Sequence, residues 1–328
     1  MKHTVICSAI GLFALSCAAP LLAHDYTGLI RAEKFTEVER LVNAKLAQDP
    51  INHDALIAKV ELIIGTGGER IDEAIKLAEQ CVASHPKESD CQESLGVAMG
   101  TKAMSAGIMS AVGSISKIRD AFKRAVELDP KSLSARFLLL QFYTQTPSFV
   151  GGSTSKAKEV LADTAKFNPE AGKLMQGFLE LADEQPGKAE AIALAANVGT
   201  HETLRDNQRE ILLGVASDYL KNKKYADSER VFRALQQRFP ESEIGTYGLG
   251  RCEQEQGKHQ AAVALFEKAS SITPTPRARV QYRLGVSQQA LGEKAKALIS
   301  YEKALAAKPG LNKKLAEEAQ DKIKALKS

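Results

Sequence analysis

The sequence predicts an all-α protein in which pairs of antiparallel helices stack into a solenoid. One pattern occurs twice between Glu243 and Leu311, with a spacing of 35 residues. Prolines also punctuate the chain at intervals that suit the ends of helix pairs. The composition is 44% hydrophobic and 5% aromatic with no tryptophan, which fits helices packed by alanine and leucine better than a β-sandwich. The matched positions are Leu249-Gly250 with Leu284-Gly285, Gly257 with Gly292, Ala262 with Ala297, Phe266 with Tyr301, Ala269 with Ala304, and Pro274 with Pro309.

Each position of this pattern has a physical role in a helix pair. Gly250 and Ala262 have little or no side chain, so they suit the point where the two helices approach most closely. Phe266 is expected to fill the gap beside them, and Gly257 permits the turn between the helices. A single pair buries only one of its apolar sides. Successive pairs must therefore stack, and the chain becomes a solenoid.

The Leu-Gly, Ala-x-x-x-Phe and Pro positions at this period resemble the tetratricopeptide repeat. The resemblance implies a right-handed superhelix that binds a protein or peptide without catalysis, in a concave groove lined by the first helix of each pair. The groove positions of that family fall here on two tyrosines and three arginines. These partner-binding candidates are Tyr247, Arg251, Arg279, Tyr282 and Arg283.

Two of these candidates match a basic pair that some members of the family use to hold a peptide carboxylate, namely Arg279 and Arg283. The remaining clamp positions are occupied by Leu213, Ser217 and Gly248, which argues against capture of a carboxyl terminus. The alternative is a solvated arginine row with tyrosines that only pack. Arginine and tyrosine are nevertheless typical residues of binding hot spots.

The chain divides into four expected regions. Residues 1–23 are predicted to be a signal peptide, 24–203 irregular helix pairs, 204–311 regular repeats, and 312–328 a helix that caps the array. The irregular part departs from the period near 100–118 and 146–155. We expect eight pairs in all. A polar stretch, 197–208, is either a hinge or an ordinary long turn.

The first 23 residues carry Lys2, an apolar run and a small-residue end, which is typical of a Sec-type export signal. We therefore expect a periplasmic or secreted protein. A lipid anchor at Cys17 is an alternative, but Leu15 stands one position too close to the cysteine for a lipoprotein box. No later segment offers the roughly 20 apolar residues that a membrane span needs.

The departure near residue 100 adds about ten residues to the period of about 34. It is rich in glycine and contains Met99, Met104 and Met109, and no charged residue occurs from Ala103 to Ser116. Longer helices that bury more core are one interpretation. An apolar docking ridge is another, because methionine adapts to irregular apolar partners. In the second departure, Pro147 to Gly152 resembles a turn in exported bacterial repeat proteins, and we expect Phe149 and Val150 to tuck against the neighbouring pair.

Three cysteines follow the export signal. Cys81 and Cys91 stand five residues before and after Pro86, so antiparallel helices joined there would bring them together, as a disulfide or as two buried thiols. Cys252 is expected in the core. No Cys-x-x-Cys occurs and the histidines are scattered, so we expect no metal site, and no motif indicates another cofactor.

The sequence carries no Gly-x-Ser-x-Gly and no His-Glu-x-x-His, and we expect no enzyme. The formal net charge of +4 is mild, and we expect no nucleic-acid partner. From Thr275 onward, however, 12 lysines and arginines stand against 5 acidic residues. We therefore expect an exported, non-catalytic scaffold that holds a protein or peptide segment, possibly acidic, in its groove. The alternative is a small-molecule or lipid carrier, or a lipoprotein assembly factor, that uses the methionine-rich insertion.

Overall fold

The computed structural model describes residues 24–273 and 277–328, together with the backbone but not the side chains of 108–111. Over these residues the regular structure is seventeen α-helices and one 3-10 turn, which confirms the predicted all-α solenoid. The export signal and Cys17 lie outside the described residues, as does Pro274. Within the described part, no helix is both long and apolar enough to cross a bilayer.

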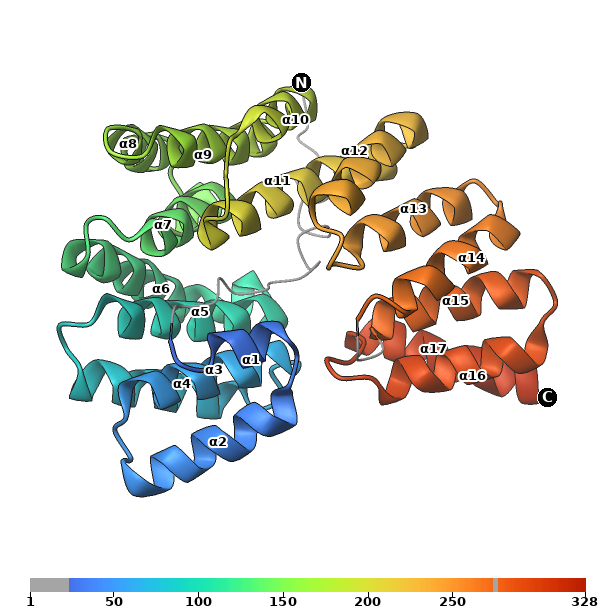
Figure 1. Cartoon of the computed structure of the whole chain (residues 1–328), viewed down its shortest axis with the longest axis horizontal. Helices are drawn as coiled ribbons and strands as arrows, with labels where there is room; N and C mark the ends of the chain where they lie inside the picture. Colours follow the sequence, from blue (N-terminus) through green and yellow to red (C-terminus); the bar gives the residue numbers. More distant parts are fainter. Residues whose placement is uncertain (1–23, 274–276) are drawn as a thin grey trace.

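Helices α1 to α16 form eight successive pairs, each helix packed on the next, and α17 packs on α16 as the capping helix. In Figure 1 the pairs follow one another around an arc. The helices of the first five pairs are α1 (Thr27–Arg31), α2 (Phe35–Gln48), α3 (His53–Gly65), α4 (Ile71–Ser84), α5 (Ser89–Ala106), α6 (Ile108–Leu128), α7 (Leu133–Gln145), α8 (Thr154–Ala165), α9 (Pro169–Ala182) and α10 (Pro186–Ala195), with the 3-10 turn η1 (Ser148–Val150) between α7 and α8.

The second half of the arc is more regular. A polar segment expected as a hinge or long turn, 197–208, is mostly helix, because α11 begins at Glu202. Its Gln208 is buried and donates to the carbonyl of Ala193, which fixes the start of α11 against the preceding helix. The helices here are α11 (Glu202–Lys221), α12 (Tyr225–Arg238), α13 (Ile244–Glu255), α14 (His259–Ser270), α15 (Ala278–Ala290), α16 (Lys294–Ala306) and α17 (Lys313–Lys327).

Local signals account for many of the helix ends. Short polar side chains cap the amino termini: Asn52, Ser132 and Asn168 each accept a hydrogen bond from the amide three residues on. Prolines follow α2, α4, α6, α12 and α16 within three residues, as the sequence predicts. Pro169 differs, since it opens α9 at a position where its missing N–H costs nothing.

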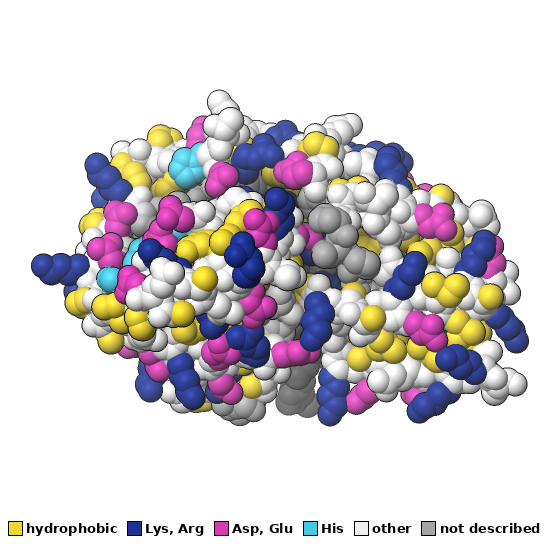
Figure 2. Space-filling model, turned by 60° about the horizontal axis from the view of Figure 1, so that its bottom comes forward, with side chains coloured by type: hydrophobic (Ala, Val, Ile, Leu, Met, Phe, Trp, Pro, Cys, Tyr) yellow, Lys and Arg dark blue, Asp and Glu magenta, His cyan; other side chains and the backbone are white. Residues whose placement is uncertain are grey.

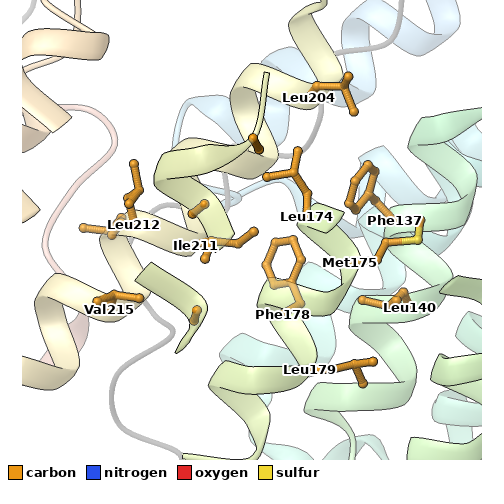
Figure 3. Close-up of a cluster of buried hydrophobic side chains, with 14 of the residues drawn as sticks. Phe137, Leu140, Leu174, Met175, Phe178, Leu179, Leu204, Ile211, Leu212 and Val215 are labelled. Atoms are coloured by element: carbon orange, nitrogen blue, oxygen red, sulfur yellow. The ribbon is translucent and has the colours of Figure 1, made fainter. Parts of the chain in front are cut away.

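The largest core cluster runs through the middle of the array. Figure 3 shows Phe137, Met175, Phe178 and Ile211 meeting there, from α7, α9 and α11. All four side chains are buried. Each pair therefore shares its core with the next, as a solenoid requires.

Close approach within the regular pairs follows the repeat pattern. A Cβ added to Gly250 would lie 2.7 Å from the Phe266 ring, and one added to Gly285 would lie 2.8 Å from the Tyr301 ring. Gly96 and Phe122 make the same contact in the α5–α6 pair, at 2.4 Å. Both helices of that pair are long, with 18 and 21 residues against 12 and 12 in α13 and α14. The additional residues of α5 and α6 therefore extend these helices beyond the point where Gly96 meets Phe122.

The two ends of the arc touch. The Lys308 ammonium lies 2.9 Å from Glu69, Arg277 pairs with Glu33, and a Cβ added to Gly67 would lie 3.4 Å from the Cα of Pro309. A cavity of about 600 Å³ lies at this junction, lined by residues of α2, α3 and α16. The superhelix is therefore closed end to end. On the face that Figure 2 shows, acidic and basic side chains are interspersed rather than gathered in one patch.

Candidate functional site

A cavity of about 420 Å³ opens among the first helices of three successive pairs, α11, α13 and α15, and is closed at one end by α17. We call it the groove. All five residues that the sequence predicts as partner-binding line it, so the structure brings them together. They are Tyr247, Arg251, Arg279, Tyr282 and Arg283.

Helical spacing and acidic partners position the arginines. Arg279 and Arg283 are four residues apart on α15 and therefore share one face. Arg283 donates to the side chain of Gln254 at 3.1 Å and lies 3.7 Å from Glu255. Arg251 pairs with the same carboxylate at 3.2 Å. Glu255 thus holds two guanidinium groups from neighbouring helices side by side.

The two tyrosines have different exposure. Tyr247 is half-buried, with its ring 5.9 Å from that of Phe266 between centroids. Tyr282 is only 4% exposed and packs on Tyr301. Burial, together with a hydrogen bond to Glu318 of α17, raises the pKa of Tyr282 well above its ordinary value. Tyr282 is therefore part of the wall, and Tyr247 offers more surface to an occupant.

The residues that depart from the family's carboxylate clamp also line the groove: Leu213, Ser217 and Gly248. A Cβ added to Gly248 would lie 2.1 Å from the Phe232 ring, so that ring occupies the space where a side chain would stand. These positions therefore carry no amide or ammonium group of the kind that the clamp would need. This composition favours binding along an extended peptide segment over capture of a peptide's carboxyl terminus.

Two lysines of the groove were not among the predicted residues. Lys221 ends α11 and Lys223 follows it, and both are exposed. Lys221 occupies the position that Glu255 occupies one repeat later, so the repeat register could have found it. With three arginines and two lysines against Glu255, the lining carries an excess of positive charge. Such a lining attracts anionic groups.

A family model described as tetratricopeptide repeat matches residues 242–309. This segment contains α13 to α16, and all five predicted groove residues lie on α13 or α15. Residues 242–309 therefore match tetratricopeptide repeats. No curated protein matches it.

Several solved structures are similar to this chain at low sequence identity. A tetratricopeptide repeat protein from Parabacteroides merdae ATCC 43184 is 20% identical, covers 84% of this chain and 99% of its own, and gives a TM-score of 0.45. The type IV pilus biogenesis factor PilW is 16% identical, covers 66% of this chain and 92% of its own, and gives 0.42. The Cut9–Hcn1 complex of the anaphase-promoting complex is 14% identical, covers 92% of this chain and 54% of that one, and gives 0.44.

The methionines of the insertion, which forms the α5–α6 pair, lie in different environments. Met99 is partly buried and packs on the large core cluster, whereas Met104 is 52% exposed. The side chain of Met109 lies outside the described residues. The two described methionines thus divide between core and surface.

Cys81 and Cys91 form a disulfide that joins the end of α4 to the start of α5, with their Cα atoms 5.4 Å apart. Both are buried among Leu56, Ile57 and other apolar residues. His53 lies within 4.8 Å of the two sulfurs, but a disulfide presents no thiolate to a metal ion. Cys252 is a buried thiol of the tetratricopeptide region.

Proposed function

We propose that this protein is a non-catalytic scaffold of the cell envelope that holds a partner polypeptide in the groove of its C-terminal tetratricopeptide repeats. Domains built from this repeat generally bind proteins. The export signal predicted at residues 1–23 supports a periplasmic or secreted location. The observation that carries the proposal is the meeting of Arg251, Arg279 and Arg283 in one cavity that Leu213 and Leu315 also line.

The chemistry of the groove supports binding of an extended peptide segment that combines acidic and apolar side chains. Acidic groups would pair with Arg279 and with the lysines at the end of α11, while Leu213 and Leu315 provide apolar contact on opposite sides. Tyr247 and Arg251 are of the types that concentrate binding energy at interfaces. The cavity, about 420 Å³, suits a few side chains rather than a folded domain.

The test is a binding assay with fluorescent peptides in which glutamate, leucine and phenylalanine are combined, and with counterparts in which lysine replaces glutamate. We expect the acidic peptides to bind more tightly, and their affinity to fall as salt is raised. Arg279→Glu with Arg283→Glu should weaken acidic-peptide binding about 10-fold or more.

The control for this variant carries the same change in charge elsewhere. Arg124 on α6 and Arg233 on α12 are exposed and lie outside the groove, so Arg124→Glu with Arg233→Glu should bind as the wild type does. An equal loss of peptide affinity in both double variants would show that binding responds only to the net charge of the protein. Preference for the lysine peptides would contradict the proposed chemistry.

A further inference from the structure

The α5–α6 pair carries the longest hairpin arms of the array. Its helices have 18 and 21 residues, whereas the neighbouring first helices α3 and α7 have 13 each. The turn between them is made at Gly107, whose φ of 84° is in the region that favours glycine. Cβ atoms added to Gly100, Gly107 or Gly113 would meet nothing within 4 Å. The end of this hairpin therefore stands in open space.

Apolar side chains are exposed at this end. Met104 on α5 is 52% exposed and Val112 on α6 is 47% exposed, on either side of the turn. No charged residue occurs from Ala103 to Ser116. Most of the described residues of this stretch, 103–107 and 112–116, are exposed, and an exposed helical surface usually carries charge.

The next turn of the solenoid adds an exposed aromatic ring. The 3-10 turn η1 contacts α6, and Phe149 within it is 76% exposed, contrary to the expectation that it would tuck against the neighbouring pair. Val150 does pack against the core, and this fixes Phe149 outward. Gly152 fixes the turn, since a Cβ there would lie 1.7 Å from the carbonyl oxygen of Thr146. Phe149 is thus held in water by a rigid turn.

Basic residues flank this uncharged stretch in the sequence. Lys102 and Lys117 bracket the uncharged stretch, and Lys123 follows on α6; all three are exposed. Lys102 pairs with Asp72 at 2.6 Å, but both groups are exposed, so the pair is open to solvent and counter-ions. Across residues 101–123 four cationic side chains stand against the single carboxylate of Asp120.

We propose that this edge of the solenoid docks on an anionic lipid bilayer, with Met104, Val112 and Phe149 entering the interface and Lys102 and Lys117 contacting the headgroups. We call these five residues the lipid edge. Exposed apolar side chains with lysines on the same helix pair suit the headgroup region, which accepts apolar side chains to a depth of about 5–10 Å. This inference concerns a different surface from the groove and does not depend on the proposed function. A protein partner at this edge is the competing outcome.

The test uses the absence of tryptophan from the chain. Phe149→Trp introduces a single tryptophan, which can be excited selectively over the tyrosines, at the lipid edge. Mixing this variant with vesicles of equal phosphatidylcholine and phosphatidylglycerol should shift its emission to the blue, and brominated lipids should quench it. Ile299→Trp is the matched control, because Ile299 on α16 is as exposed as Met104, at 52%, but lies on another repeat. Its emission should not change.

Co-sedimentation with the same vesicles separates the apolar and ionic contributions. Met104→Asp with Phe149→Asp should lower vesicle affinity about 10-fold or more, and Lys102→Glu with Lys117→Glu should abolish the preference for phosphatidylglycerol over phosphatidylcholine alone. Ile299→Asp should bind as the wild type does. Circular dichroism of each variant should match the wild type, since every altered side chain is exposed.

Three results would overturn the proposal: no sedimentation of the wild type with anionic vesicles, no blue shift of Phe149→Trp in bound protein, or equal shifts at positions 149 and 299. A purified protein that binds this edge while vesicles do not would assign the surface to a protein partner instead.

Discussion

Lys308 and Glu69 form an ion pair at 2.9 Å although 239 residues separate them in the chain. Both side chains are exposed, so this pair by itself contributes little to stability. The partners of Arg277 are less exposed. Glu33 and Glu243 are 13% and 16% exposed, and both face the guanidinium. Arg277 is therefore the main ionic contact where the superhelix closes.

We expect Arg277→Glu to open the ends of the arc, because it sets three carboxylates against one another. Small-angle scattering should give a larger radius of gyration than for the wild type. Lys324→Glu is the control, since its neighbour Asp321 lies on the same helix and both are exposed. Adding Glu33→Lys to the Arg277→Glu variant should recover part of the compact form. Identical scattering curves for all variants would show that the contacts of Arg277 are not needed to close the ends.

The second prediction concerns a buried carboxyl group. Glu93 is 2% exposed and accepts hydrogen bonds from Ser132 at 2.9 Å and Ser89 at 3.3 Å. Burial raises the pKa of Glu93 from 4.5 to about 7. The folded protein therefore keeps a proton that the unfolded chain loses above pH 4.5. The free energy of unfolding should fall by about 3 kcal/mol as pH rises from 4.5 to above 7.

Urea unfolding at several pH values tests this point. Glu93→Gln should remove the contribution of Glu93, so that the wild type and the variant differ most above pH 7, where the variant should be the more stable. Equal pH profiles for the two proteins would show that Glu93 does not titrate in this range.

The third prediction concerns close helix packing. Gly250→Ala forces a Cβ to within 2.7 Å of the Phe266 ring, and we expect it to lower the free energy of unfolding by about 1–3 kcal/mol. Gly100→Ala is the matched control, because it meets nothing within 4 Å and lies inside α5. That change should stabilise the protein by about 0.5–1 kcal/mol. Chemical unfolding of both variants gives the comparison, and destabilisation of equal size would refute the packing argument.

The fourth prediction concerns the disulfide between Cys81 and Cys91, which are 10 residues apart in sequence. A loop of this size should contribute about 2–3 kcal/mol to the free energy of unfolding. Cys81→Ala with Cys91→Ala should lose that amount and become insensitive to dithiothreitol, whereas the wild type should lose it only when reduced. No effect of the reductant on wild-type unfolding would contradict this contribution.

The repeat register explains how much the sequence could predict. A fixed spacing of small and aromatic residues implies helix pairs, and the same register brings Tyr247 and Arg283 into one cavity. Contacts within a helix pair or between adjacent pairs are local, so they can be predicted from the repeat period. Lys221 occupies the same repeat position as Glu255, so it follows from the register only when the less regular copy before Glu243 is aligned as well.

Other features depend on geometry that no local pattern contains. The contact of Arg277 with Glu33 arises only after eight pairs have accumulated their twist, so it has no sequence signature. The outward position of Phe149 depends on the tight turn at Gly152, where backbone sterics outweigh the preference of an aromatic ring for burial. Similarly, the start of α11 at Glu202 is stabilised by packing, which overrides the polar character of 197–208.

The central claim is that a partner polypeptide lies in the groove. The most direct measurement is photo-crosslinking in the producing cells, with a benzophenone amino acid in place of Tyr247 and, as control, of Ile299 on α16. We predict a crosslinked protein adduct from position 247 that disappears in the background of Arg279→Glu with Arg283→Glu, and none from position 299. Adducts that form equally at both positions, or that survive the charge reversal, would contradict the account.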